Sequence, residues 1–409
     1  MAPHAGEARF QGVTAVATAS RARSAVLLVF ACNGAVFASL ASRLPDLKST
    51  LHLTPGQLGA TLLLGASGSV LGLPLSGAVI HRVGARSTVQ LACVVVVLGY
   101  TAAVLAAVVG GSRWGFAAGL FVGTLAIGPW DVAMNLEGAG VERALGRSVM
   151  PLFHAAFSIG TVLAALVGAL LAWLHTSIVV HVAAAAVLGA VASWWAAARF
   201  LPRSAEAEAA PGTTRGRAGI RRAWLEPRTL LIGVMVLAAA FMEGTANDWV
   251  AIAFHEGHQL PTWAGVLAFA LFLASMTAGR VVGTRLLDRL GRVPLLRALF
   301  VLATAGSLLV VFGAPAAAYA GAVLWGLGAS LGFPVGMSAA ADDPQRAPAR
   351  MSVVSTVGYV AFLVGPALLG WLGDHVGVLH SLVVVGVAAL LAGAVVPAAR
   401  EPGRPAPVG

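Results

Sequence analysis

Ser158-Ile-Gly160, followed by Ala169-Leu-Leu-Ala-Trp173-Leu174, recurs in the second half of the chain as Thr356-Val-Gly358, followed by Ala367-Leu-Leu-Gly-Trp371-Leu372. The glycine and the tryptophan are both displaced by 198 residues, and each copy lies in a long uncharged run. Apolar helices resemble one another by chance, so this match alone is weak evidence. It becomes informative if other segments repeat in the same register.

Two further segments repeat at equivalent places. His81-Arg82-Val83-Gly84-Ala85-Arg86 corresponds to Asp288-Arg289-Leu290-Gly291-Arg292, and both lie between apolar runs. Gly128-Pro129 corresponds to Gly332-Phe333-Pro334, and we expect each pair to break a helix. Three matches in register predict that the chain is a duplicated helical bundle.

The composition identifies the class of protein. Charged residues are 10% of the 409 residues, against about 25% in soluble globular proteins, and hydrophobic residues are 58%. A soluble fold could not cover its surface with polar groups, and disordered chains are poor in apolar residues. We therefore expect an all-α membrane protein with 12 transmembrane helices in two six-helix bundles. The predicted spans are 24–44, 56–80, 88–109, 114–138, 149–173, 177–198, 229–252, 262–284, 294–313, 316–339, 350–373 and 379–398.

The basic residues predict the orientation. The net charge of +10 does not indicate nucleic acid, because the arginines are scattered between apolar runs. With a cytoplasmic N-terminus, 23 of the 26 Lys and Arg residues lie on the cytoplasmic side, five of them at the connection after 262–284. We expect a multi-pass protein of the inner or plasma membrane with both termini cytoplasmic. The predicted parts are a tail 1–23, a bundle 24–198, a linker 199–228, a bundle 229–398 and a tail 399–409.

On these motifs the sequence resembles the major facilitator superfamily (MFS) over nearly its whole length. Gly77-x-x-x-His81-Arg82-x-Gly84-x-Arg86 is similar to the signature loop of that family, with His81 where the family usually has aspartate. The resemblance implies alternating access between two bundles, with the gating loops latching the cytoplasmic side. The gating candidates are His81, Arg82, Arg86, Asp288 and Arg289.

Three further segments resemble one branch, the YbjJ-like inner-membrane group related to fucose permease. They are Ala41-Ser-Arg43-Leu-Pro45-Asp46-Leu-Lys48, Asp131-Val-Ala-Met-Asn135 and Gly146-Arg147-Ser-Val-Met150-Pro-Leu-Phe153-His154. Fucose-permease-type symporters use acids in their first and fourth helices. The first span here has no acid, and Asn33 is the strongly polar side chain well inside it.

Ionisable residues within spans are candidate functional sites, because their burial in hydrocarbon is costly. Asp131 and Asn135 lie one turn apart in the span 114–138, and His154 lies at a comparable depth in the span 149–173. We expect a carboxylate–imidazole pair that relays a proton or, alternatively, a static contact between the two helices.

The span 229–252 holds the second group of candidates. Glu243 lies near its middle, Asn247 one turn further on the same face, and Asp248 near its outer end. We expect Gly244 to let the helix unwind beside Glu243 and Trp249 to serve as an interfacial anchor. Four other acids lie at span ends, where contact with water is a sufficient explanation: Glu142, Asp342, Asp343 and Asp374.

These features predict a secondary active transporter that moves a small organic solute together with protons by alternating access. We do not expect an enzyme. A drug/proton antiporter is the alternative, although such exporters typically carry an arginine in the fourth helix and a glycine-proline motif in the fifth, which are absent here. A membrane sensor or enzyme is a remote alternative. The expected partners are the solute, protons and the lipid bilayer, with no nucleic acid, and we expect a monomer. No cofactor or metal is expected, since no phosphate loop or redox motif is present and the pair His255 and His258 lacks further ligands.

Overall fold

The computed structural model describes all residues except 1–4, 147–148, 203–216, 344 and 402–409, and the described residues contain helices but no strand. Residues 203–216 of the predicted linker 199–228 therefore lie outside the described residues. The first half contains α1 Ala5–Ala41, α2 Leu44–Thr50, α3 Pro55–Val108, α4 Arg113–Leu145, α5 Met150–Trp173 and α6 Ile178–Ala197. The second half contains α8 Arg217–Ala223, α9 Pro227–Thr245, α10 Thr262–Leu290, α11 Arg292–Phe312, α12 Pro315–Ala329, α13 Gly332–Ala340, α14 Ala347–Val376, α15 Val378–Ser381 and α16 Val383–Val395. Two π-helical segments, η2 Ala246–Val250 and η3 Ala253–Gly257, follow α9, and a 3₁₀ turn, η4 Val396–Ala399, follows α16.

Eleven described helical segments are long and apolar enough to cross a membrane. One of them, α3, has 54 residues and would be about 80 Å long as a straight helix, more than twice the thickness of the hydrocarbon core. Gly84 has φ 82° and ψ 163°, so the chain turns there between two helical stretches. With α3 counted as two crossings, the structure is consistent with the twelve predicted spans.

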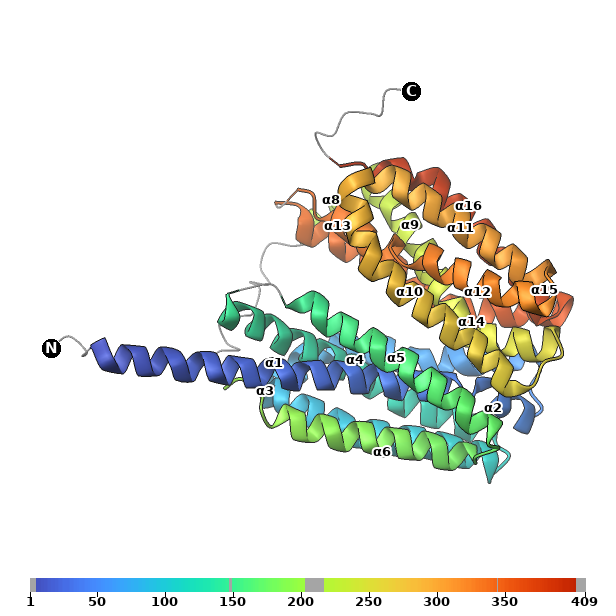
Figure 1. The fold of residues 1–409 in the computed structure, drawn as a ribbon, viewed down its shortest axis with the longest axis horizontal. Coiled ribbons are helices and arrows are strands. Elements are labelled where there is room, and N and C mark those ends of the chain that lie inside the picture. The colour runs from blue at the N-terminus through green and yellow to red at the C-terminus, as the bar shows by residue number, and fades with distance from the viewer. Residues whose placement is uncertain (1–4, 147–148, 203–216, 344, 402–409) are drawn as a thin grey trace. The chain divides into compact units, whose positions relative to one another are not determined.

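The chain forms two compact units. Unit 1 contains residues 1–40, 64–171 and 175–211, and unit 2 contains residues 41–63, 172–174 and 212–409. In unit 1 the long helices lie side by side (Figure 1). Their contacts are close because small residues meet: a Cβ added to Gly160 of α5 would lie 2.1 Å from the carbonyl oxygen of Ala31 in α1.

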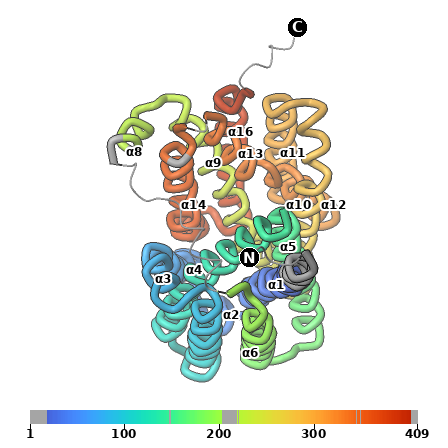
Figure 2. The backbone as a smooth tube through the Cα atoms, turned by 90° about the vertical axis from the view of Figure 1, so that its left-hand side faces the viewer, coloured from blue at the N-terminus to red at the C-terminus, as the bar shows by residue number. Residues whose placement is uncertain are grey.

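Unit 2 repeats this way of packing. Helix α9 contacts α13, α14 and α16, and α12 contacts α10 and α11 (Figure 2). Gly358 of α14 is the repeat partner of Gly160, and a Cβ there would lie 2.8 Å from a side-chain carbon of Val236 in α9. The duplication predicted from the sequence therefore has a counterpart in the helix contacts.

The outer surface of both units is apolar. Large aliphatic side chains project from the helices with exposed fractions above one half, among them Leu98, Leu188, Val301 and Leu391. A soluble protein rarely exposes contiguous apolar surface of this kind. Together with the length of the helices, this surface identifies a protein that lies in lipid.

The two predicted helix breaks have different outcomes. Helix α4 continues through Gly128-Pro129, so the first prediction is wrong, because a single missing N–H donor does not end a helix that neighbouring helices hold in place. In the second half the chain does leave the helix, at Ser330 and Leu331, and Gly332 begins α13.

Candidate functional site

The end of α9 departs from regular α-helix where its polar residues are found. Glu243 lies in the last turn of α9, and the chain then continues through η2 and η3. Such π-helical segments are rare in proteins, and those that occur often lie at functional sites. The predicted unwinding at Gly244 is not seen: the helix widens instead, and a Cβ on Gly244 would meet the ring of Phe362 at 3.1 Å.

Glu243 forms an ion pair within unit 2. Its Oε2 accepts a hydrogen bond from a terminal nitrogen of Arg280 in α10 at 2.9 Å. The Nε of Arg280 also donates to the carbonyl oxygen of Ser330 at 3.3 Å, a group left without a helical partner where α12 ends. The side chains of Arg280 and Glu243 are 32% and 21% exposed, so water or a solute can reach both.

Arg280 is a functional candidate that the sequence interpretation missed. From the sequence it is counted with the basic residues of the connection after 262–284. The structure places it inside α10, about 27 Å from Thr262 and about 15 Å from Leu290 at 1.5 Å per residue. The signal that could have found it is an arginine within an otherwise uncharged run, 262–284.

Asn247, Asp248 and Trp249 lie in η2. The Oδ1 of Asn247 is buried and accepts no hydrogen bond, and the carboxylate of Asp248 has no hydrogen-bond or ion-pair partner among the described residues. Trp249 is fully buried, so the expectation of an interfacial anchor is wrong; the wider π turn directs its ring into the helix bundle. Asn247 and Asp248 thus lie four and five residues after Glu243, with acceptor oxygens that no donor of the described residues satisfies.

In unit 1 the structure brings together two of the three predicted residues. The Nδ2 of Asn135 donates to the backbone oxygen of Asp131 at 2.9 Å and to its Oδ1 at 3.3 Å. The ring of His154 instead lies edge-on to Phe30, with centroids 5.3 Å apart. Asp131 therefore accepts a hydrogen bond from a residue of its own helix, and the proton relay with His154 stays a prediction.

Two further polar side chains of unit 1 are almost fully buried. Asn33 in α1 is 4% exposed, and its Nδ2 has no hydrogen-bond partner among the described residues. Glu137 in α4 is 1% exposed, and its Oε1 accepts from the backbone N–H of Leu201 at 2.6 Å, just beyond the end of α6. Glu137 therefore fixes the end of α6, whereas Asn33 keeps an unused donor.

Two of the four acids at span ends are less solvated than expected, whereas Asp343 and Asp374 are exposed to water as predicted. The prediction that water solvates Asp342 is wrong. Its side chain is 8% exposed and forms ion pairs with Arg228 at 2.7 Å and Arg292 at 2.8 Å. Glu142 accepts hydrogen bonds from the backbone N–H groups of Val149 and Met150 at 2.7 and 2.8 Å. Folding places these carboxylates beside arginines or free helix N-termini, which sequence separation does not reveal.

The gating-loop candidates are exposed, and the two loops share one backbone geometry. Gly84 has φ 82° and ψ 163°, and Gly291 has φ 80° and ψ 168°, a region that favours glycine. In the second loop Arg292 makes the ion pair with Asp342. The candidates that lie exposed on these loops are His81, Arg82, Arg86, Asp288 and Arg289.

Metal binding finds no support among the described residues, which contain no cluster of three or more His, Cys, Asp or Glu side chains able to hold an ion. A ring nitrogen of His255 contacts the carbonyl oxygen of Leu260 at 2.7 Å, and one of His258 contacts that of Val310 at 2.8 Å. Both histidines thus pack the end of unit 2 through backbone carbonyls.

Comparison with known proteins places this geometry in a family. The family model described as Major Facilitator Superfamily matches residues 147–347 and 268–409. An uncharacterized MFS-type transporter of Yersinia pestis is 31% identical over 378 residues, which cover 91% of this chain and 94% of the relative. The chain belongs to the major facilitator superfamily. This MFS protein is also 26% identical over 367 residues to the membrane protein MosC of Rhizobium meliloti, covering 88% of this chain and 86% of the relative.

Solved MFS structures share its fold at low sequence identity. The nucleoside transporter NupG aligns with a TM-score of 0.73 at 14% identity, covering 93% of this chain and 99% of that one. A D-xylose-proton symporter aligns with a TM-score of 0.72 at 15% identity, covering 92% and 96%. The fucose:proton symporter of E. coli aligns with a TM-score of 0.59 at 14% identity, covering 91% and 98%. At these identities the likeness concerns the fold alone; the family rests on the family model and the Yersinia pestis relative.

Proposed function

We propose that this MFS protein is a secondary active transporter that moves a small polar organic solute together with protons by alternating access. The observation that carries the proposal is the ion pair between Glu243 and Arg280 at 2.9 Å, inside membrane-spanning helices. Charges at this depth are costly and mark transport pathways in membrane proteins. Coupling to protons follows from the chemistry of the pair.

Ionised Glu243 attracts Arg280, whereas protonated Glu243 does not. Loss of that attraction leaves N–H donors of Arg280 available to an oxygen of the solute. Protonation and solute binding then favour each other, and the coupling is reciprocal. A solute with hydroxyl, carbonyl or carboxylate oxygens fits this donor, and the unsatisfied Oδ1 of Asn247 offers an acceptor one turn from Glu243.

The polar residues of unit 1 are proposed to take part as well. Asn33 has a buried donor without a partner in the described part of the chain, and Asp131 and Asn135 present a carboxylate and an amide one turn apart. Proteins named as nucleoside, xylose-proton and fucose:proton transporters share the fold, and their solutes are small and polar. Their names support the same class of solute here.

The experiment uses the purified full-length protein in liposomes that contain a pH-sensitive dye. Small polar solutes are added outside one at a time, and the pH of the lumen is followed. Symport predicts that a transported solute acidifies the lumen, since a proton enters with it; drug/proton antiport predicts that the lumen becomes alkaline. Transport without any pH change would overturn proton coupling.

Glu243→Gln separates the role of the pair from a general loss of fold. It keeps the shape of the side chain and removes its charge, and we expect it to abolish the pH change. Asp343→Asn is the matched control, because Asp343 is an acid of the same unit outside the spans, with its side chain 38% exposed. An equal loss in both variants would contradict a specific role of Glu243.

The orientation is part of the proposal. We propose that both termini face the cytoplasm of a cell with this protein in its inner or plasma membrane, because 23 of the 26 Lys and Arg residues then lie on the cytoplasmic side. A single cysteine at Arg113 should then react with a membrane-impermeant reagent added to whole cells, whereas one at Arg222 should not. The reverse labelling would refute the orientation.

A further inference from the structure

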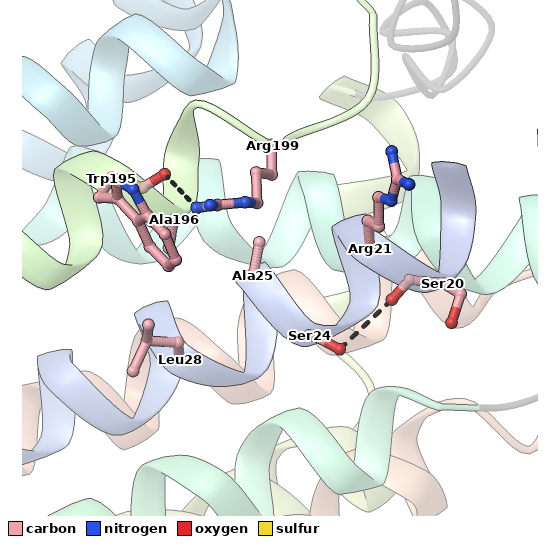
Figure 3. A pocket seen from close by; sticks show the side chains of 8 residues that line it. All are labelled: Ser20, Arg21, Ser24, Ala25, Leu28, Trp195, Ala196 and Arg199. Carbon is pink, nitrogen blue, oxygen red and sulfur yellow. Dashed lines mark hydrogen bonds between the residues drawn. The ribbon is translucent and has the colours of Figure 1, made fainter. Parts of the chain in front are cut away.

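Unit 1 contains an open pocket of about 580 Å³ between α1 and the end of α6. Ser20, Arg21, Ser24 and Leu28 contribute from α1, and Trp195 and Arg199 contribute from the end of α6 and the residues that follow it (Figure 3). Its volume falls within the range of about 300–1,000 Å³ that is typical of ligand sites. The transport proposal does not use any of these residues.

The described residues that line the pocket include two arginines and no carboxylate. Arg21 is exposed and has no hydrogen-bond or ion-pair partner among the described residues. The guanidinium of Arg199 stacks over the ring of Trp195 at 3.2 Å from its centroid and donates once, to the backbone oxygen of Trp195 at 3.1 Å (Figure 3). A guanidinium has five N–H donors, so most donors of the two arginines have no acceptor within the described part of the chain and suit an anion.

The two ends of the pocket differ in polarity. Arg21 lies near the start of the apolar segment Thr18–Thr50 of α1, and Arg199 lies two residues beyond α6, so the basic end of the pocket lies where the apolar part of α1 begins and α6 ends. Leu28 is 37% exposed and lies about 10 Å further along α1 at 1.5 Å per residue. Trp195 is 59% exposed at the basic end, where tryptophans in membrane proteins contact the headgroup region.

We propose that this pocket binds the headgroup of an anionic phospholipid from the leaflet on the side of the N-terminus. In this proposal the phosphate lies between Arg21 and Arg199 and an acyl chain runs along Leu28, all three of which line the pocket (Figure 3). The hydroxyl of Ser24 already donates to the backbone oxygen of Ser20 at 3.4 Å. Arginine forms bidentate hydrogen bonds with phosphate, and basic pockets between transmembrane helices on the cytoplasmic side bind anionic headgroups. A soluble phosphate compound matches the basic end but not the apolar end.

The test is native mass spectrometry of the full-length protein released from nanodiscs of phosphatidylcholine with or without phosphatidylglycerol. Wild type should retain phosphatidylglycerol in preference to phosphatidylcholine, and millimolar glycerol 3-phosphate should not displace it. The double variant Arg21→Gln/Arg199→Gln should bind phosphatidylglycerol about tenfold to thirtyfold more weakly. Arg143→Gln is the matched control, since it removes an exposed arginine of the same unit that does not line the pocket, and it should retain the lipid.

Equal retention in the double variant and the control would overturn the site, and so would equal retention of the two lipids by wild type. Displacement by glycerol 3-phosphate would identify a soluble phosphate site instead and overturn the lipid. A second measurement does not depend on the arginine variants: phosphatidylglycerol with brominated acyl chains should quench the fluorescence of wild type more than that of Trp195→Phe. The same quenching in both proteins would place the lipid elsewhere.

Discussion

Asp342→Asn should destabilise the protein because it removes the charge that two arginines share. Its Oδ2 accepts from Arg228 at 2.7 Å, and Arg292 donates to its two oxygens at 2.8 and 3.0 Å. Loss of one partner of a buried ion pair costs about 3–5 kcal/mol. The cost is lower here, because Arg228 is 36% exposed and Arg292 keeps a hydrogen bond to the Oγ of Ser338 at 3.0 Å. We expect a loss of about 2–3 kcal/mol.

The neighbouring acid provides a matched control with the same substitution. The side chain of Asp343 is 38% exposed, and its ion pair with Arg346 at 3.3 Å involves an arginine that is 54% exposed. Exposed pairs contribute about 0–1 kcal/mol, so Asp343→Asn should cost at most about 0.5 kcal/mol. The assay is reversible unfolding of both variants in mixed micelles with increasing SDS. Equal losses for the two variants would refute the argument from burial.

Three further predictions use the same unfolding assay. Gly59→Ala should cost about 1–3 kcal/mol, because its Cβ would collide with the carbonyl oxygen of Pro366. Gly77→Ala should be neutral or stabilising by up to about 1 kcal/mol, because no atom lies within 4 Å of the new Cβ. The opposite order of stabilities would contradict the close contact at Gly59. Glu256→Gln should lower the free energy of unfolding by about 1–3 kcal/mol, and Lys48→Met by less than about 1 kcal/mol. Lys48 is 9% exposed and would remain buried without its partner, whereas Glu256 is 36% exposed and can reach water. Equal losses in the two variants would count against this asymmetry. The hydrogen bond from Arg350 to Glu226 at 2.6 Å holds the pKa of Glu226 below its ordinary value of 4.5. The stabilisation by this pair is therefore complete above pH 4.5 and is lost as the pH falls through the lowered pKa. Glu226→Gln should be less stable than wild type at neutral pH, and the difference should vanish in acid.

The fold could be predicted from the sequence because hydropathy and repetition act over long stretches. Every predicted span is helical over most of its length, and the two glycines of the repeated loops adopt nearly the same dihedral angles. Local breaks were harder to predict. Gly128-Pro129 and Gly332-Phe333-Pro334 are similar in sequence, yet the helix continues through the first and is interrupted just before the second. The contacts of neighbouring helices decide that outcome, and the amino-acid sequence alone does not reveal those contacts.

The candidate site was predictable in part. The cost of charge in lipid selects Glu243 and Asp131 without any structure. The partner of Glu243 was not predictable, because Arg280 lies 37 residues away and its sequence position also fits a basic loop. The direction in which the Trp249 side chain points depends on the π-helical segment η2, which shifts the register of the helix after Thr245. No established sequence signal predicts such a segment.

The measurement that tests the central claim most directly compares two kinds of transport by Glu243→Gln in liposomes, once a transported solute is known. Accumulation of the radiolabelled solute against its gradient, driven by an imposed pH gradient, requires a proton to be carried. Exchange of labelled for unlabelled solute at equal pH requires only solute binding and alternating access. The account predicts that Glu243→Gln loses accumulation while it retains exchange, and accumulation at the wild-type level in this variant would contradict it.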